Sequence, residues 1–500
     1  MRHLKRSDVQ PGLDQGAGCE PDGRPSQAID LRARGARGVV SAAMWFLLGP
    51  RALASALGLL RGPQRVVPTP PEDWRRARVD VVICARNQQR CIVHCMAALA
   101  AQTVRPRRLL LVDDGGAARD HTAQLAREFA QANGLNLNII VRRWSLGRGA
   151  TLRKQARSFD GDVLFALDGD TVLDSPDYIE RCVRELYQGA GIASACGQLR
   201  TLGRAHRQAI AATGAFRAWL AGDHWEDPHG RQPRHERVMR WMGDAYRETL
   251  ALYEQRLINR GQMDRTGGIA RPVGPVAYRR RYLKDLFDRW EPVRGDDLTG
   301  DEDQFIGMAL AHEGYRNVQL PDVTARRCGE GLLRLPAAAH RESVAFLEGA
   351  RAFDALLRTP LTRLHNATHR GPHAELDTGH EQRRIVEAYR QPFGERLTRL
   401  CGRPIGTVLH LTALERIGLP ALVVGAVALG HGTTLLAVLG VEALIVAGLL
   451  AWLSPGSRGS AAARGLLTAP LRYGLMLAEW AALLRFAARR VRGGLRPARA

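Results

Sequence analysis

Lysine is nearly missing from this chain of 500 residues. Only Lys5, Lys154 and Lys284 occur, although lysine and arginine together number 72 against 50 acidic residues, for a net charge of +22. The arginines are spread along the chain, so we interpret the charge as a bias in composition and predict no nucleic-acid partner. A chain this basic still favours anionic partners, either an anionic membrane surface or an anionic substrate.

The eight cysteines lack the spacings that metal and redox motifs require. No C-x-x-C pair occurs, and the cysteines and histidines show no zinc spacing. Because disulfides are typical of oxidising compartments, we expect a reduced protein that faces the cytosol.

Long apolar runs are few, and each is interrupted. Residues 37–61 are broken by a Gly-Pro-Arg triplet, which predicts a kinked membrane helix or an interfacial helix. Residues 417–453 are nearly uncharged but interrupted by a His-Gly pair, which favours a membrane hairpin over one long helix; a buried soluble helix pair is the alternative. Residues 465–488 carry three charges and either span a bilayer or lie on its surface.

The remaining segments complete the predicted organisation. Residues 1–36 are expected to be a disordered basic tail, and a second basic tail at 489–500 is expected to stay cytosolic. Between 78 and 321, strand and helix patterns alternate, which predicts an α/β domain with a parallel sheet. Residues 322–416 are mostly helical and polar.

The most informative motif is DVLFALDGDTVLDS at 162–175. Its apolar run predicts a buried strand that ends at Asp168 and Asp170. Side chains at i and i+2 of an extended segment point the same way, so both carboxylates can converge on Mg²⁺ or Mn²⁺. Gly169 lets a phosphate approach the backbone, so we expect a metal-bound nucleotide diphosphate here. A solvated turn is the alternative for so short a motif.

Three further segments place polar groups at the ends of predicted strands, where α/β sheets bind ligands. RVDVVICARN at 78–87 ends in polar residues over which a nucleotide base could sit. RLLLVDD ends at Asp113 and Asp114, whose carboxylates can accept a hydrogen bond from a uracil N–H. SLGRGATLR opens a helix where backbone amides and Arg148 can meet a diphosphate.

Together these segments resemble the family-two glycosyltransferases, especially the membrane-embedded synthases of hyaluronan, chitin-oligosaccharide and cellulose type. The resemblance rests on VVICARN, LLLVDDGG, ALDGDTVLDSPDYI, GPVAYRRRYL and GDEDQFIGMALAHEGY, and covers about residues 78–320. It implies a nucleotide-sugar-binding (GT-A-like) α/β domain flanked by N- and C-terminal membrane helices. It also implies uridine binding by Ala85, Asn87 and Asp114, with Asp113 adjacent, and metal binding by Asp168 and Asp170.

The resemblance further implies a general base that deprotonates the acceptor hydroxyl. Asp297, Asp301 and Asp303 are the candidates, and the following helix that ends in Gly-Tyr favours Asp303, with Glu302 as its acidic neighbour. A helix N-cap is the structural alternative for Asp303, and the two roles are compatible.

The chain departs from this family at the QxxRW motif of its processive members. The nearest segment is EGARA at 348–352, which keeps Arg351 but lacks the glutamine and the tryptophan. An enzyme that builds a short chain or adds a single sugar therefore becomes a candidate. We expect a multi-pass enzyme of the cell membrane with a cytoplasmic catalytic domain and an acceptor side in residues 322–416. It would transfer a sugar from a UDP-sugar to a polysaccharide or lipid-linked acceptor, with exopolysaccharide export partners possible. The alternatives are a single-addition polyprenyl-phosphate glycosyltransferase and a non-catalytic scaffold.

Overall fold

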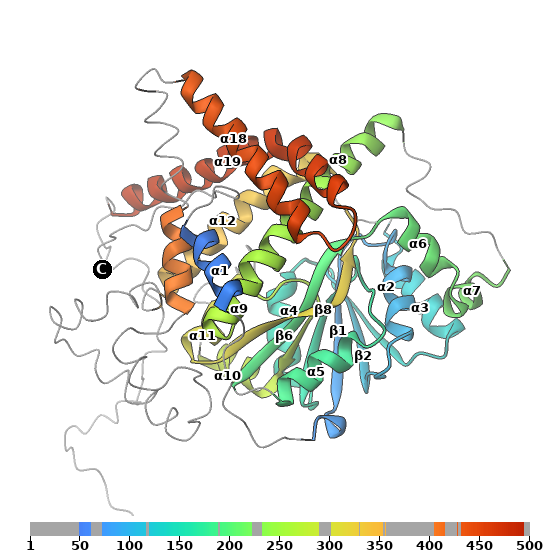
Figure 1. Cartoon of the computed structure of the whole chain (residues 1–500). Coiled ribbons are helices and arrows are strands. Elements are labelled where there is room, and N and C mark those ends of the chain that lie inside the picture. Colours follow the sequence, from blue (N-terminus) through green and yellow to red (C-terminus); the bar gives the residue numbers. More distant parts are fainter. Residues whose placement is uncertain are drawn as a thin grey trace, which may run out of the picture.

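A computed structural model of the chain describes residues 50–61, 73–116, 120–188, 191–222, 233–289, 302–329, 331–353, 405–415 and 432–494, together with the single residues 356 and 428. At its centre is an eight-stranded sheet in the order β3-β2-β1-β4-β7-β6-β8-β5 (Figure 1). The strands are β1 (Val79–Ala85), β2 (Arg108–Asp113), β3 (Leu137–Val141), β4 (Val163–Asp168), β5 (Thr171–Leu173), β6 (Ile192–Thr201), β7 (Val276–Arg279) and β8 (Arg316–Arg327).

The first half of the sheet is parallel, as its continuous apolar runs predict. β1 pairs with β2 on one side and with β4 on the other. The register sets Ala85 opposite Asp113 and Cys84 opposite Asp168. The carboxyl ends of three parallel strands therefore meet at one edge of the sheet.

The prediction of a wholly parallel sheet is wrong for the second half. β7 runs antiparallel to both β4 and β6, and β5 runs antiparallel to β8. The chain leaves β6 at the edge where the parallel strands end, winds through α6 to α9, and re-enters as β7 at the same edge. No crossover of the sheet occurs, so the pairing is antiparallel. The sheet is mixed for this reason.

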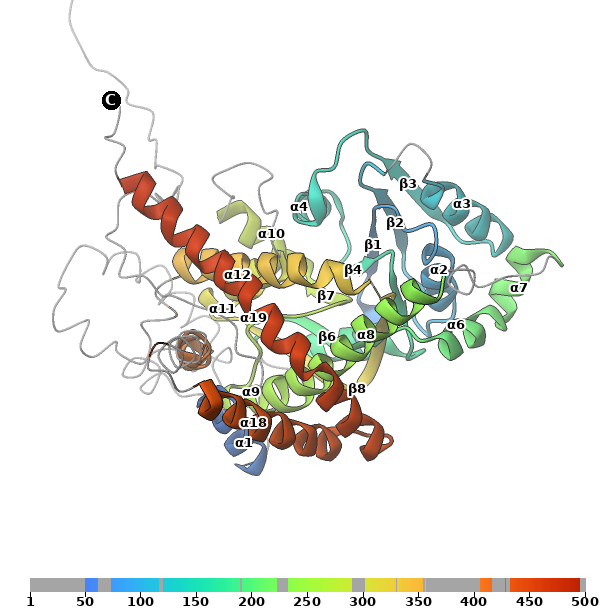
Figure 2. The ribbon, with the colours of Figure 1, turned by 90° about the horizontal axis from the view of Figure 1, so that it is seen from above.

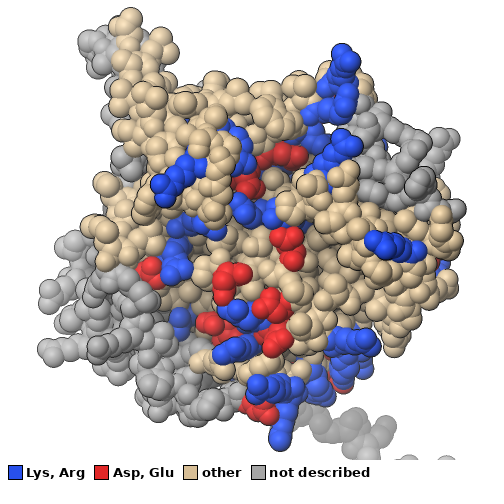
Figure 3. Space-filling view, turned by 45° about the vertical axis from the view of Figure 1, so that its right-hand side comes forward, with Lys and Arg blue, Asp and Glu red and all other residues tan. Residues whose placement is uncertain are grey.

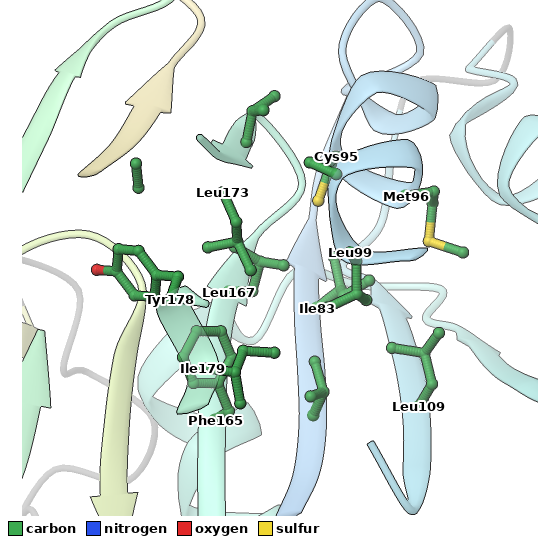
Figure 4. Close-up of a cluster of buried hydrophobic side chains, with 14 of the residues drawn as sticks. Ile83, Cys95, Met96, Leu99, Leu109, Phe165, Leu167, Leu173, Tyr178 and Ile179 are labelled. Atoms are coloured by element: carbon green, nitrogen blue, oxygen red, sulfur yellow. The ribbon is translucent and has the colours of Figure 1, made fainter. Parts of the chain in front are cut away.

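Helices cover both faces of the sheet and bury its alternating side chains. One face carries α2 (Ile92–Ala100), α3 (Thr122–Ala132) and α5 (Tyr178–Gln188). Figure 4 shows this core, in which Ile83 and Phe165 of the strands lie among residues of α2 and α5. The other face carries α4 (Gly147–Ser158), α10 (Arg280–Arg289), α11 (Glu302–His312) and α12 (Leu335–Ala352).

An outer group of helices packs beside this domain. It comprises α1 (Pro50–Arg61), α8 (Arg234–Ala251), the π-helix η2 (Leu252–Asn259), α9 (Arg260–Thr266), α18 (Gly432–Leu453) and α19 (Arg458–Gly494). α19 lies across α12 and α8, with α18 alongside it (Figure 2). α1 approaches α9 so closely that a Cβ on Gly261 would lie 2.2 Å from the Ser55 carbonyl oxygen. α6 (Arg204–Ala211) and α7 (Gly214–Leu220) lie near α2 and α3.

The predicted membrane segments are not confirmed. Within the described residues, no helix is both long enough and apolar enough to cross a bilayer. The N-terminal tail 1–36 and most of the first arm of the expected hairpin lie outside those residues.

A disulfide joins Cys91, just before α2, to Cys328 at the end of β8. The expectation of fully reduced cysteines is therefore wrong for this pair. The two residues are 237 positions apart in sequence, so only the fold brings them together. Four other described cysteines are free: Cys84, Cys95, Cys182 and Cys196.

Candidate active site

The ends of β1, β2 and β4 form the floor of the candidate site. The amide of Gly169 donates to the Cys84 carbonyl at 2.8 Å, and the amide of Asp114 donates to the Ala85 carbonyl at 2.8 Å. A Cβ at position 169 would lie 2.9 Å from the Cβ of Ala85, so this close approach requires glycine. The DxD turn and the acidic end of β2 are thereby both fixed against β1.

Asp114 is saturated by groups of the loop between β3 and α4. Its Oδ1 accepts from Arg142 Nη1 at 2.8 Å and from the Leu146 amide at 3.0 Å. Its Oδ2 accepts from Ser145 Oγ at 2.8 Å and from the Gly147 amide at 2.7 Å. Burial alone would raise the pKa of this carboxyl, but the four hydrogen bonds outweigh it and lower the pKa. Asp114 therefore holds the loop that carries Arg148.

Asp113 is in the opposite situation. Its side chain is buried, and its Oδ1 accepts no hydrogen bond from any described residue. Burial, with the nearby carboxylates of Asp120 and Asp114, raises the pKa of Asp113. A buried acceptor of this kind is suited to a donor supplied by a ligand. Asn87 lies beside it in the loop after β1, with a left-handed backbone (φ 56°) and an exposed side chain.

Arg148 joins the DxD pair to the candidate base. Its Nε lies 3.0 Å from Asp168 Oδ1, and its Nη1 donates to Asp303 Oδ1. Burial would lower the pKa of this guanidinium, but the charges of Asp303 and Asp168 raise it. Glu302, the first residue of α11, accepts from the Gly149 amide at 3.0 Å in the first turn of α4. The starts of α4 and α11 are therefore tied together at the end of β4.

Arg327 is a site residue that the sequence analysis missed. It lies at the end of β8, where its Nη2 donates to Asp168 Oδ2 and its Nε lies 3.5 Å from Asp170 Oδ1. Only the pairing of β8 with β5 brings it to the DxD turn. In the sequence, the one local signal is the alternation of residues along the strand that ends at Arg327. That alternation does not identify the side chains that this arginine contacts. Acidic and basic side chains intermingle near the centre of the face shown in Figure 3.

The donor set of the DxD pair fits a divalent cation that also binds a diphosphate. Within the described residues, no three acidic, histidine or cysteine side chains gather as a metal cluster. Asp168 and Asp170 supply two carboxylates that are 21% and 15% exposed. Mg²⁺ is commonly held by one or two carboxylates together with substrate phosphates. These two residues would hold the metal, and Arg327 would have to give up its contacts with them.

Three further candidates from the sequence are Arg351, Asp297 and Asp301. Arg351 belongs to the last turn of α12, and Glu348 on the same helix is exposed. Asp297 and Asp301 lie outside the described residues. Asp303 is the candidate base that lies within the described residues, and Arg148 links it to Asp168.

Comparison with known proteins agrees with this arrangement. Residues 80–231 match the family model described as glycosyl transferase family 2. An N-acetylglucosaminyltransferase of Azorhizobium caulinodans is 23% identical over 258 residues, which cover 50% of this chain and 54% of that protein. An undecaprenyl-phosphate 4-deoxy-4-formamido-L-arabinose transferase of Pseudomonas fluorescens is 28% identical over 144 residues, which cover 28% and 38%. The chain thus spans about half the length of the first relative and little more than a third of the second.

Among solved structures, a mannosyltransferase of Pyrobaculum calidifontis in complex with GDP-Man and Mn²⁺ aligns with 74% of this chain and 94% of its own. The identity is 16%, and the TM-score of 0.38 is too low to carry an argument.

Residues 80–231 thus match a family of sugar-transferring enzymes. This part of the chain belongs to an α/β domain built on a mixed sheet. The family match and the two relatives support the expected enzyme class, glycosyltransferase.

Proposed function

We propose that this protein is a membrane-attached, metal-dependent inverting glycosyltransferase. It transfers a sugar from a UDP-sugar to a hydroxyl group of a polysaccharide or lipid-linked acceptor. The observation that carries the proposal is the position of Arg148, which contacts both Asp168 of the metal pair and Asp303. Transfer of a sugar from a nucleoside diphosphate requires a group that binds a cation and a general base. Here one guanidinium reaches both.

The donor half is assigned to the ends of β1 and β2. The hypothesis from sequence gave the uracil contact to Asp114, together with Ala85 and Asn87. Because Asp114 already accepts four hydrogen bonds while Asp113 Oδ1 accepts none from the described residues, the geometry favours Asp113 for the uracil N–H. Ala85 and Asn87 keep their predicted place beside the base.

Arg148 lies between the candidate base and the metal pair, and the two take different parts in the reaction. Asp303 accepts the proton of the acceptor hydroxyl as its oxygen attacks the anomeric carbon. Arg148 and Arg327 offer positive charge to the departing diphosphate oxygens. A metal on Asp168 and Asp170 would add Lewis-acid stabilisation of the same charge. Glu302 fixes the start of α11 and so the position of the base.

Membrane attachment is supported by exposed apolar side chains on the outer helices. Leu60 of α1 is 84% exposed, Leu436 of α18 is 70% exposed and Leu484 of α19 is 67% exposed. Such side chains are costly in water and are stabilised in a bilayer interface. With these helices against the cytoplasmic face of the cell membrane, the sugar-nucleotide site stays in the cytoplasm.

Single addition to a polyprenyl phosphate is the second candidate. The missing QxxRW motif and the activity named for the Pseudomonas relative favour it. The two candidates differ in their need for Asp303. An ionised phosphate oxygen attacks without giving up a proton, whereas a hydroxyl needs a base.

The test uses the full chain in membranes with Mn²⁺ or Mg²⁺ and a panel of labelled UDP-sugars. For a hydroxyl acceptor, Asp303→Asn is expected to lower kcat by about 10²–10⁴-fold with the donor KM little changed. Asp288→Asn, at an exposed ion pair with Arg157, is the matched control. Full transfer by Asp303→Asn contradicts the base assignment. No transfer or hydrolysis of any donor by the wild type contradicts the proposed function as a whole.

A further inference from the structure

A cavity of about 270 Å³ lies between the sheet and the outer helices. One wall is formed by the end of β6 together with Arg327, the last residue of β8, and Cys328 directly after it. The other walls are formed by α1, α8, η2, α12 and the helix at 405–415. Gln304, which directly follows Asp303, also lines it. The lining therefore includes the arginine on the DxD pair and the residue that follows the candidate base.

The described lining is cationic and poor in aromatic side chains. Five arginines and two glutamates line the cavity, and further acidic partners of the arginines lie just outside the lining; the arginines are Arg51, Arg200, Arg247, Arg271 and Arg327. Phe346 is the one aromatic residue in the lining that the structure describes. A neutral sugar chain finds little flat aromatic surface here. Guanidinium groups match the oxygens of phosphate instead.

All five arginines pair with acidic side chains, and two of these pairs carry the argument. Arg200 Nη2 lies 2.7 Å from Glu248 Oε1, and Arg271 Nη1 donates to Glu342 Oε1. A guanidinium carries five N–H donors and can hold a second anion beside the first. Because the carboxylates already fix these side chains, less conformational entropy is lost when a ligand binds.

We propose that this cavity binds the phosphate group of a phosphorylated acceptor and thereby places a hydroxyl group of that acceptor at Asp303. The inference rests on the proposed function and specifies its acceptor. A phosphomonoester carries nearly two negative charges at pH 7, which suits the cationic lining. The phosphate belongs either to a soluble molecule or to a lipid headgroup, and its recognition is the same in both.

The transfer step balances without any further reagent. The acceptor hydroxyl oxygen forms the new bond to the anomeric carbon, and its proton passes to Asp303. The bond from that carbon to the diphosphate oxygen breaks, and its electron pair leaves with the nucleoside diphosphate. The acceptor phosphate is unchanged, so Arg200 and Arg271 act in binding alone.

The test offers the full chain matched acceptors with and without phosphate. Glycerol 3-phosphate is compared with glycerol, and lysophosphatidic acid is compared with monoacylglycerol in phosphatidylcholine vesicles, with Mn²⁺ and the UDP-sugar panel. We expect transfer to glycerol 3-phosphate or to lysophosphatidic acid. Transfer to the first indicates that the phosphate belongs to a soluble acceptor, and transfer to the second indicates a lipid headgroup. Arg271→Gln should raise the acceptor KM by about tenfold or more, while donor hydrolysis keeps its KM. Arg157→Gln, an arginine paired with Asp288 away from the cavity, should change neither.

Equal or better transfer to the unphosphorylated members overturns the inference, as does an unchanged acceptor KM in Arg271→Gln. A second measurement needs no turnover. Inorganic phosphate is titrated calorimetrically into the protein with the donor site saturated by UDP and Mn²⁺. Binding should weaken by about tenfold in Arg271→Gln. Equal binding by wild type and variant overturns the inference, whereas failure of donor hydrolysis alone counts against the proposed function.

Discussion

Replacing Asp114 by asparagine should destabilise the fold far more than the same change at Asp113. An amide oxygen can still accept from Arg142 and the Leu146 amide, and Ser145 can turn its hydroxyl to accept from the new NH₂ group. The Gly147 amide, however, meets a second donor, and Arg142 loses its counter-charge. Hydrogen bonds to charged groups contribute about 1.5–3 kcal/mol each, so we expect a loss of about 3–4 kcal/mol.

The measurement is urea denaturation of both variants under identical conditions. Asp113→Asn removes a buried charge whose Oδ1 has no described partner, so its stability should change by less than about 1 kcal/mol. It should instead raise the KM for the UDP-sugar by about tenfold, because the uracil N–H loses its acceptor. A larger loss of stability in Asp113→Asn than in Asp114→Asn would refute this division of roles.

Three further outcomes follow from buried groups outside the donor site. Burial raises the pKa of Asp244 from 3.8 to about 6, so the folded protein loses stability as the pH rises through that window. Asp244→Asn should therefore be more stable than the wild type by on the order of 2 kcal/mol at pH 7 and equal to it at pH 3, measured by thermal melts. Gly261→Ala should cost about 1–3 kcal/mol, because its Cβ meets backbone at Ser55; Gly459→Ala, with nothing within 4 Å, should not destabilise. Cys328→Ser should cost about 2–5 kcal/mol, and a reductant should lower the wild-type melting temperature but not that of the variant.

The sequence was sufficient to locate the DxD turn and the strands that surround it. β1, β2 and β4 are continuous apolar runs that end in polar residues, and burial on both faces explains that pattern. The order of the motifs was enough to group three distant residues at one edge of the sheet; they are Asp168, Arg148 and Asp303. The sequence analysis gave the uracil contact to Asp114, whereas our proposal gives it to Asp113. The local pattern could not separate them, because both are acids and successive side chains of a strand point to opposite sides.

The acceptor side depended on contacts that no local pattern encodes. β7 has only four residues, too few to show a period, and its direction is set by the helices that precede it. Arg327 and Cys328 reach the site through the pairing of β8 with β5, which joins segments more than 150 residues apart. Neither a spacing rule nor the charge of the segment could have indicated these long-range partners.

The place of β7 in the sheet decides how the molecule can be divided. The family match ends at residue 231, but β4 and β6 are joined only through β7, which begins at Val276. A fragment that stops at 231 would keep β6 without either of its neighbours and would expose β4 as an open edge. The strands β1, β2 and β4 and the later elements from β7 onward are therefore parts of one cooperative unit, and a disruption in the later part should unfold the earlier part in the same transition.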